Sequence, residues 1–451
     1  MYLDRVMYKS SGQRDPFIDS AVYERLLEAK PFPGPLLPNI RHLAISLSYL
    51  SNNDPVPHLV LGSHLRKLRI LGTCDNVVDL FIDWENLGTL LTSTGARESL
   101  VDLGITLEDP YAYCIPFHVP CPDSLVTTLT QSKRLTKLDL ESFKISKPET
   151  IAALGLIPNL ETLAMNVQLE ELGTLPDLPA DHEGYFSSLK RLKLIVSSPR
   201  VISELLFQWK ASRLETLVIE RSSREFIWDL RDLCKDFARS LSPAALRALT
   251  LCNGIDPYFT MPYNQNISDL PHDALKQLFS FPHLEKLAIN LGAKVQCQDT
   301  NLLEYAIAWP SMRHFELYER EFSEPAQVTP AGVHAFVSSL PFLRHLTLRF
   351  NASNPSYFLE INAIRPHRLR YLDVCTSDAD ESAPLVPFLE CAFPMLEDFH
   401  WGWVYEHPQI PGSGWETRLE DEDEQIRNDD SHECWISTFD RLVNLPRLKR
   451  Y

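Results

Sequence analysis

The chain has 451 residues and a formal net charge of −17, from 43 lysines and arginines against 60 aspartates and glutamates. This acidic balance disfavours binding to nucleic acid or to anionic membranes, since both need Lys and Arg to meet their phosphates. The nine cysteines are odd in number and scattered, which is typical of buried thiols in a reducing compartment. We therefore expect a cytoplasmic or nuclear protein.

Residues 1–38 precede the first repeat and contain no apolar run of signal-peptide type. Within them, 17–29 predicts a helix that buries Phe17 and Val22. Four prolines between 31 and 38 then end it. No later stretch approaches the roughly 18 apolar residues of a membrane span. We expect 1–38 to form an N-terminal helical cap or connector.

A short pattern then recurs thirteen times, as in PNLETLAM at 158–165. A central apolar residue has one apolar residue three positions before it and another two positions after it. The central residues are Leu43, Leu68, Leu103, Leu138, Leu163, Leu192, Leu217, Leu249, Leu287, Phe315, Leu346, Leu372 and Phe399. Residues two apart share one face of a strand, so each copy predicts a turn and a short strand.

The segments between copies have helical period. They are 199–210, 224–241, 271–280, 300–308, 329–339 and 384–391. Strand, loop and helix in repetition predict an α/β leucine-rich-repeat solenoid, with a curved parallel sheet inside and helices outside. We place about 13 irregular repeats over 39–410 and expect the long insertions to be loops; these are 72–99, 107–125, 168–186, 253–270 and 403–433.

The end of the chain changes in composition. Residues 411–433 are too acidic to bury themselves and are predicted to form a flexible loop. Residues 434–451 follow as a terminal helix over 434–445 and a partial repeat.

Motifs for catalysis or cofactor binding are missing from the sequence. It has no GxSxG, no GxxxxGK[ST] and no GxGxxG. Cys114, His118 and Cys121 have a spacing that could hold zinc, but no fourth ligand stands nearby. The acidic run 420–424 lacks the glycine and spacing of a calcium loop. We predict no enzyme, no catalytic residue, no cofactor and no metal site.

A partner-binding surface is predicted on the concave face, where residues beside the core leucines point away from the helices. In the later repeats these are His, Tyr, Arg and carboxylates, which suit recognition of a polar protein partner. The predicted residues are His314, Glu316, Tyr318, His345, Arg349, Tyr371, Asp373, Asp398, His400 and Trp403. The alternative is a plain solvated sheet face, with Trp403 packed in the core if its strand continues.

The repeats FPHLEKLAI at 281–289, LPFLRHLTL at 340–348 and FPMLEDFHW at 393–401 resemble F-box/leucine-rich-repeat proteins of basidiomycete fungi. The resemblance covers roughly 36–451. In that family an F-box docks a Skp1 adaptor, and the repeats select substrates for a cullin–RING ubiquitin ligase.

The resemblance implies a non-enzymatic scaffold that serves as the substrate-recognition part of an SCF-type (Skp1–cullin–F-box) ligase. The chain departs from the family because 1–38 has no recognisable F-box. Skp1 is therefore an implied partner only if an F-box lies upstream. A free-standing leucine-rich-repeat interaction protein with no ubiquitin role is the alternative.

Overall fold

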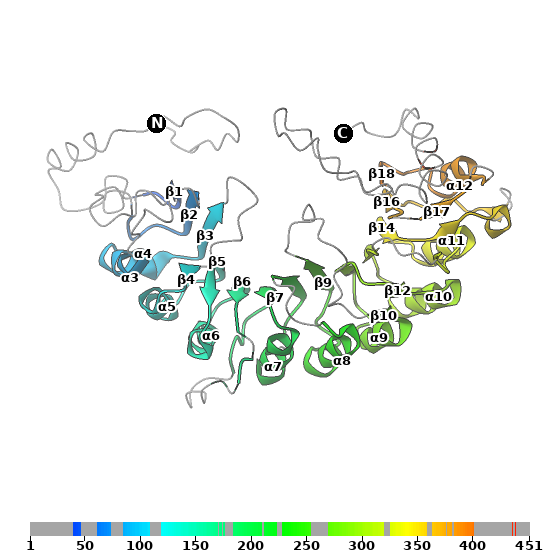
Figure 1. Cartoon of the computed structure of the whole chain (residues 1–451). Coiled ribbons are helices and arrows are strands. Elements are labelled where there is room, and N and C mark those ends of the chain that lie inside the picture. Colours follow the sequence, from blue (N-terminus) through cyan, green and yellow to red (C-terminus); the bar gives the residue numbers. More distant parts are fainter. Residues whose placement is uncertain are drawn as a thin grey trace, which may run out of the picture. The chain divides into compact units, whose positions relative to one another are not determined.

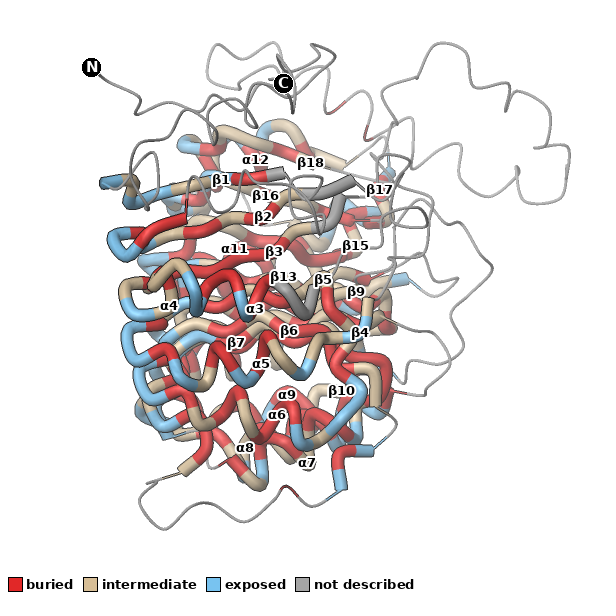
Figure 2. The backbone as a smooth tube through the Cα atoms, turned by 90° about the vertical axis from the view of Figure 1, so that its left-hand side faces the viewer, coloured by how far each residue is buried: buried red, intermediate tan, exposed pale blue. Residues whose placement is uncertain are grey.

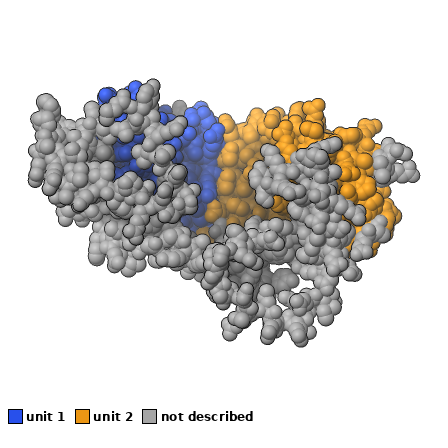
Figure 3. Space-filling view, turned by 90° about the horizontal axis from the view of Figure 1, so that it is seen from above, with its two compact units in different colours: residues 1–196, 208–213 blue, residues 197–207, 214–451 orange. Residues whose placement is uncertain are grey.

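The structure is a computed structural model. It describes residues 39–46, 61–73, 84–108, 119–169, 171–173, 175, 184–209, 212–222, 228–253, 269–319, 325–358, 363–375, 377–380, 383–400, 435 and 438. The predictions for 1–38 and for the acidic loop at 411–433 lie outside these residues. The chain divides into two compact units (Figure 3), unit 1 with residues 1–196 and 208–213 and unit 2 with 197–207 and 214–451.

Unit 1 is a run of parallel strands with central leucines directly opposite one another. The strands are β1 (His42–Ser46), β2 (Lys67–Thr73), β3 (Asp102–Glu108), β5 (Lys137–Ile145), β6 (Thr162–Val167) and β7 (Arg191–Val196), with β4 (Val119–Pro120) beside β5. Leu68, for example, lies opposite both Leu43 and Leu103. The helices are α3 (Trp84–Ser93), α4 (Ala96–Ser99), α5 (Asp123–Thr130) and α6 (Pro148–Gly155).

Unit 2 continues the same pattern. Its strands are β8 (Thr216–Arg221), β9 (Ala248–Asn253), β11 (Lys286–Asn290), β13 (His314–Leu317), β14 (His345–Leu348), β16 (Tyr371–Asp373) and β18 (Asp398–His400). Two small pairs stand apart, β10 (Leu270–Pro271) with β12 (Val295–Gln296) and β15 (Asn351–Ala352) with β17 (Asp378–Ala379).

The helices of unit 2 follow the strands one by one. They are α8 (Leu230–Ser240), α9 (His272–Gln277), α10 (Asp299–Ala308), α11 (Pro330–Ser339) and α12 (Leu385–Ala392), with short 3-10 turns η3 (Leu278–Ser280) and η4 (Pro355–Tyr357). Helix α7 (Pro199–Trp209) precedes them, and its last two residues are counted with unit 1.

The core of each unit lies between the strands and the helices, which line one side of the sheet (Figure 1). Leu163 in unit 1 and Leu287 in unit 2 are both 0% exposed. Buried residues recur along strands such as β2, β3 and β5 in Figure 2. Each such leucine contributes about 1.5–3 kcal/mol of hydrophobic free energy relative to an exposed one. The parallel, in-register repetition of strand and helix confirms the predicted leucine-rich-repeat solenoid and all thirteen predicted strands.

Two loop predictions were wrong. Helices α3 and α4 occupy the second half of 72–99, and α5 begins inside 107–125. Leu87 and Leu91, one helical turn apart, are buried, so an amphipathic face made this insertion helical. Among the described residues, no helix is long and apolar enough to cross a bilayer.

The predicted helix over 224–241 starts later than expected. Asp229 is extended and caps the helix, because its side chain accepts hydrogen bonds from the backbone N–H groups of Arg231 (2.9 Å) and Asp232 (3.2 Å). An aspartate cap satisfies donors that the first helical turn leaves unpaired. The helix therefore begins at Leu230.

Candidate partner-binding face

The strands β11, β13, β14, β16 and β18 present a helix-free side on which two columns of side chains run across the sheet. We call this side the ring face. One column is Lys286, His314, His345, Tyr371 and Asp398, and the other is Ala288, Glu316, Thr347, Asp373 and His400. In-register partners on parallel strands are immediate neighbours, so the strand pairing alone brings these residues together.

Three rings of the first column stack face to face. The ring centroids of His314 and His345 are 3.8 Å apart with planes at 10°, and those of His345 and Tyr371 are 3.8 Å apart at 7°. The ring of His400 lies 5.1 Å from that of Tyr371 at 30°. The strand spacing of about 4.8 Å sets this separation. Stacking uses the ring faces and leaves the ring nitrogens at the edges, where His314 Nε2 contacts Glu316 at 3.1 Å and His345 Nε2 contacts Thr347 at 3.4 Å.

Carboxylates flank the stacked rings. His314 Nε2 lies 3.1 Å from Glu316 Oε2, and His400 Nε2 lies 2.9 Å from Asp398 Oδ1. Burial raises the pKa of Glu316, but the hydrogen bond from His314 and the nearby charges outweigh it and hold the pKa below its usual value. Burial raises the pKa of Asp373, whose Oδ1 accepts the backbone N–H of Cys375 at 2.8 Å.

His345 is the most constrained ring, with a neighbour on each of its faces. Burial, and next the closeness of His314, lower its pKa to about 4 from 6.5. The ring is therefore neutral at pH 7. The phenol of Tyr371 is also neutral there, since burial raises its pKa far above the usual value. The stack thus carries no charge of its own at these two rings.

This pKa shift makes stability depend on acidity. Between pH 6.5 and pH 4 the unfolded chain binds a proton at His345 that the folded protein does not bind, so lowering the pH favours unfolding. The rings of His314 and Tyr371 and the charges of Glu316, Lys286 and His400 face the same site. Between pH 7 and about pH 4, we expect the free energy of unfolding to fall by about 2 kcal/mol less in His345→Gln than in the wild type. Urea unfolding at both pH values, with a chelator present, measures this, and parallel losses in both proteins would contradict it.

The corresponding side of unit 1 is different, because its Lys and Arg side chains pair with carboxylates on other strands of the sheet. Asp102 forms ion pairs with Arg69 at 3.0 Å and with Lys67 at 3.6 Å, and its Oδ2 accepts a hydrogen bond from Arg69 at 3.4 Å. Glu141 pairs with Lys193. On the ring face the carboxylates of Glu316 and Asp398 instead lie beside histidine rings of the stacked cluster.

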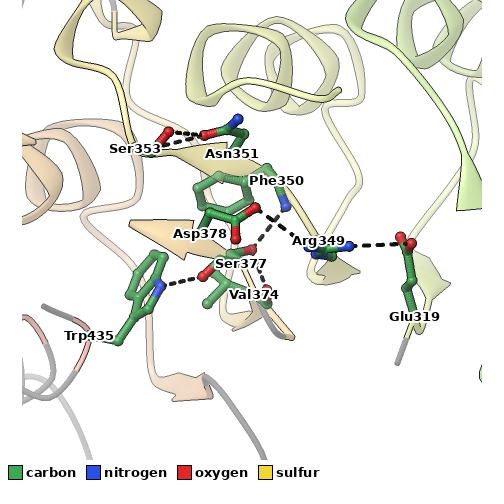
Figure 4. A network of polar contacts seen from close by, with 9 residues as sticks. All are labelled: Glu319, Arg349, Phe350, Asn351, Ser353, Val374, Ser377, Asp378 and Trp435. Atoms are coloured by element: carbon green, nitrogen blue, oxygen red, sulfur yellow. Dashed lines mark hydrogen bonds and ion pairs between the residues drawn. The ribbon is translucent and has the colours of Figure 1, made fainter. Parts of the chain in front are cut away.

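Two of the predicted site residues, Tyr318 and Arg349, lie just past the ends of the strands that form the ring face. Arg349 was expected on an exposed face, but its side chain is 4% exposed and contacts Glu319 and Asp378, each at 3.5 Å (Figure 4). Strand β14 ends at Leu348, so strand alternation no longer holds there. Tyr318 lies just past β13 and is half-buried, with its backbone N–H donating to Ile289 at 3.0 Å.

Trp403 lies outside the described residues, so its prediction stays open. The other seven predicted residues lie on the ring face: His314, Glu316, His345, Tyr371, Asp373, Asp398 and His400. Sequence reasoning missed Lys286, the cation of this face. Aligning FPHLEKLAI at 281–289 with the next two repeats would have placed it beside His314.

A cavity of about 570 Å³ lies beside the ends of the same strands, lined among others by His272, Cys297, Glu319 and Arg349. Burial raises the pKa of Cys297 to about 12, so its thiol stays protonated and is a poor nucleophile. His272 lies 2.9 Å from the hydroxyl of Tyr305 and not beside an activated thiol. His272 and Cys297 are therefore not arranged as a general base and a nucleophile in this cavity.

Comparisons with known proteins give no family assignment. A scan against protein-family models finds no match, and a search of curated proteins finds none either. Among solved structures, the chain is similar to the crystal structure of an internalin from Listeria monocytogenes, with 13% identity and a TM-score of 0.39 over 81% of this chain and 87% of that one. This similarity is too weak to carry a conclusion on function.

Proposed function

We propose that this chain is a non-enzymatic protein-interaction scaffold and that its ring face binds the partner. The observation that carries the proposal is the stacked column of His314, His345 and Tyr371 with carboxylates beside it. These side chains are already held by their neighbours, so binding costs little further side-chain entropy. Tyrosine is also among the residues that dominate binding energy at interfaces.

The charges of the ring face indicate a basic partner. Glu316, Asp373 and Asp398 lie among its described side chains, with Lys286 as the cation near them. A segment that carries Lys or Arg would complement these carboxylates. Such complementarity raises association rates and specificity, and salt weakens it.

We further propose that the chain serves as the substrate-recognition part of an SCF-type ubiquitin ligase. The support is the resemblance of its repeats, such as those at 281–289 and 340–348, to basidiomycete F-box/leucine-rich-repeat proteins. In that role the ring face selects the substrate, and an F-box upstream recruits Skp1. A free-standing interaction protein with no ubiquitin role is the second candidate, because leucine-rich repeats by themselves serve many binding functions.

The ring face is tested by the double variant His345→Ala/Tyr371→Ala. We expect it to retain at least tenfold less partner in quantitative affinity purification, since truncating central interface residues costs 2 kcal/mol or more. The matched control is Glu141→Ala/Lys193→Ala, which removes an ion pair of unit 1 and leaves the ring face intact. A His345→Gln/Tyr371→Phe variant that melts at the same temperature as the wild type is the second test. If it also retains less partner, the loss comes from missing contacts and not from unfolding.

If the double variant retains the same proteins as the wild type in the same amounts, the ring-face proposal is wrong. The ligase proposal has separate readouts. Deleting the chain should raise the abundance of the retained partner, and the natural full-length protein should co-purify with Skp1. Lack of association with Skp1 would overturn the ligase role, and an unchanged partner abundance would favour the free-standing scaffold.

A further inference from the structure

Three metal-ligating side chains converge at one end of the stack. His314 and Glu316 are two residues apart on β13 and therefore share a face, and His345 lies beside His314 on β14. One ligand atom from each of the three lies within 4.8 Å of the other two. The ion-free geometry is set by two paired strands, which are among the most rigid parts of a fold.

We propose that His314, Glu316 and His345 form a binding site for one divalent transition-metal ion of the zinc type. Two imidazoles and one carboxylate are a donor set that zinc accepts, with a further position left open for water or an added ligand. Calcium and magnesium are poor candidates, because they require oxygen ligands. Asp373 on β16, beside β14, and Asp398 on β18, one strand further, add negative charge that favours a cation.

The arrangement of the rings sets a condition on this binding. The rings of His314 and His345 are nearly parallel, so their in-plane lone pairs run side by side rather than toward one point. Both nitrogens reach one ion only if the rings tilt out of the stack. The hydrogen-bonding contact between His314 Nε2 and Glu316 Oε2, at 3.1 Å, would give way to coordination. Metal binding is therefore coupled to loosening of the His345–Tyr371 contact.

The proposed site differs from the other candidate for zinc in the sequence, which is formed by Cys114, His118 and Cys121. Cys114 and His118 lie outside the described residues, and burial raises the pKa of Cys121 to about 12. A protonated thiol is a weak metal ligand. The three residues proposed here come from two repeats about 30 residues apart, so only strand pairing brings them together.

The test uses the full chain without a histidine tag, stripped with a chelator and then titrated with zinc chloride and cobalt chloride in a calorimeter. We expect one ion per chain, a visible cobalt spectrum typical of nitrogen and oxygen ligands, and a raised melting temperature. His345→Ala and Glu316→Gln should each weaken binding at least tenfold, since changes even beyond the direct ligands cost that much. His400→Ala, on the same face but outside the three donors, should leave the affinity within a factor of about three.

Full-strength binding by His345→Ala, equal weakening by His400→Ala, or a cobalt spectrum dominated by thiolate ligands would each overturn the site. So would an absence of binding at millimolar metal. Glu316→Gln keeps the shape of the side chain and guards against a variant that fails to fold. Because no partner protein is present in this titration, its outcome is independent of whether the ring face binds a protein.

Discussion

Replacing Arg349 with methionine should cost about 3–5 kcal/mol of folding free energy at pH 8, because it leaves a buried carboxylate without its cation. Glu319, at 7% exposure, lies 3.5 Å from the guanidinium of Arg349. Burial raises the pKa of Glu319 to about 7, even though the charge of Arg349 acts to lower it. At pH 8 the carboxyl is ionised and needs that charge. Urea unfolding followed by tryptophan fluorescence measures the loss.

The same substitution should cost less in mild acid. The folded protein holds a proton on Glu319 up to about pH 7, whereas the unfolded chain releases it near 4.5. A protonated carboxyl needs no cation, so the cost of Arg349→Met should shrink between pH 8 and about pH 5. At pH 8 the double variant Arg349→Met/Glu319→Gln should be more stable than Arg349→Met alone. If the two substitutions are simply additive, the pair does not interact as the structure indicates.

Replacing Trp435 with alanine should cost about 3–5 kcal/mol, the usual cost for removing a buried aromatic side chain. Trp435 is 2% exposed, and its indole N–H donates to the backbone carbonyl of Ser377 at 2.8 Å (Figure 4). Its ring also contacts those of Phe350 (6.1 Å between centroids) and Phe399 (6.0 Å). It therefore packs against the last strands of unit 2.

The loss at Trp435 should appear first in the neighbouring repeats, because a repeat of a solenoid is stabilised mainly by the next one. Hydrogen exchange should accelerate over β16 and β18 before it does so over β9. Phe342→Ala is the matched control, since Phe342 is 53% exposed and surface substitutions usually change stability by less than about 0.5 kcal/mol. If hydrogen exchange in β18 is unchanged in Trp435→Ala, then Trp435 does not stabilise the last repeat.

The contact of Trp435 bears on the predicted terminal helix at 434–445. Of that segment the structure describes Trp435 and Thr438, both in helical conformation and both buried. The two lie three residues apart and so share one helical face. The helix over 434–445 stays a prediction, and the burial of Trp435 and Thr438 is consistent with the helical spacing of its apolar residues.

Much of the fold follows from the sequence alone, because its information is local. An apolar residue three before and two after a central leucine defines one turn and one strand wherever it occurs. Thirteen such copies cannot each bury their leucines alone, so they stack into one sheet. The same alignment places His314, His345 and Tyr371 side by side, since residues at equivalent repeat positions become neighbours across strands.

Tertiary structure decided what those neighbours do. Burial, and next the closeness of His314, lower the pKa of His345, and Arg349 is buried just past the end of its strand. Neither depends on local spacing. The sequence thus determined which side chains meet on the ring face, while packing between repeats decided their burial, their charge and the 3.8 Å stack that the proposed metal ion would have to open.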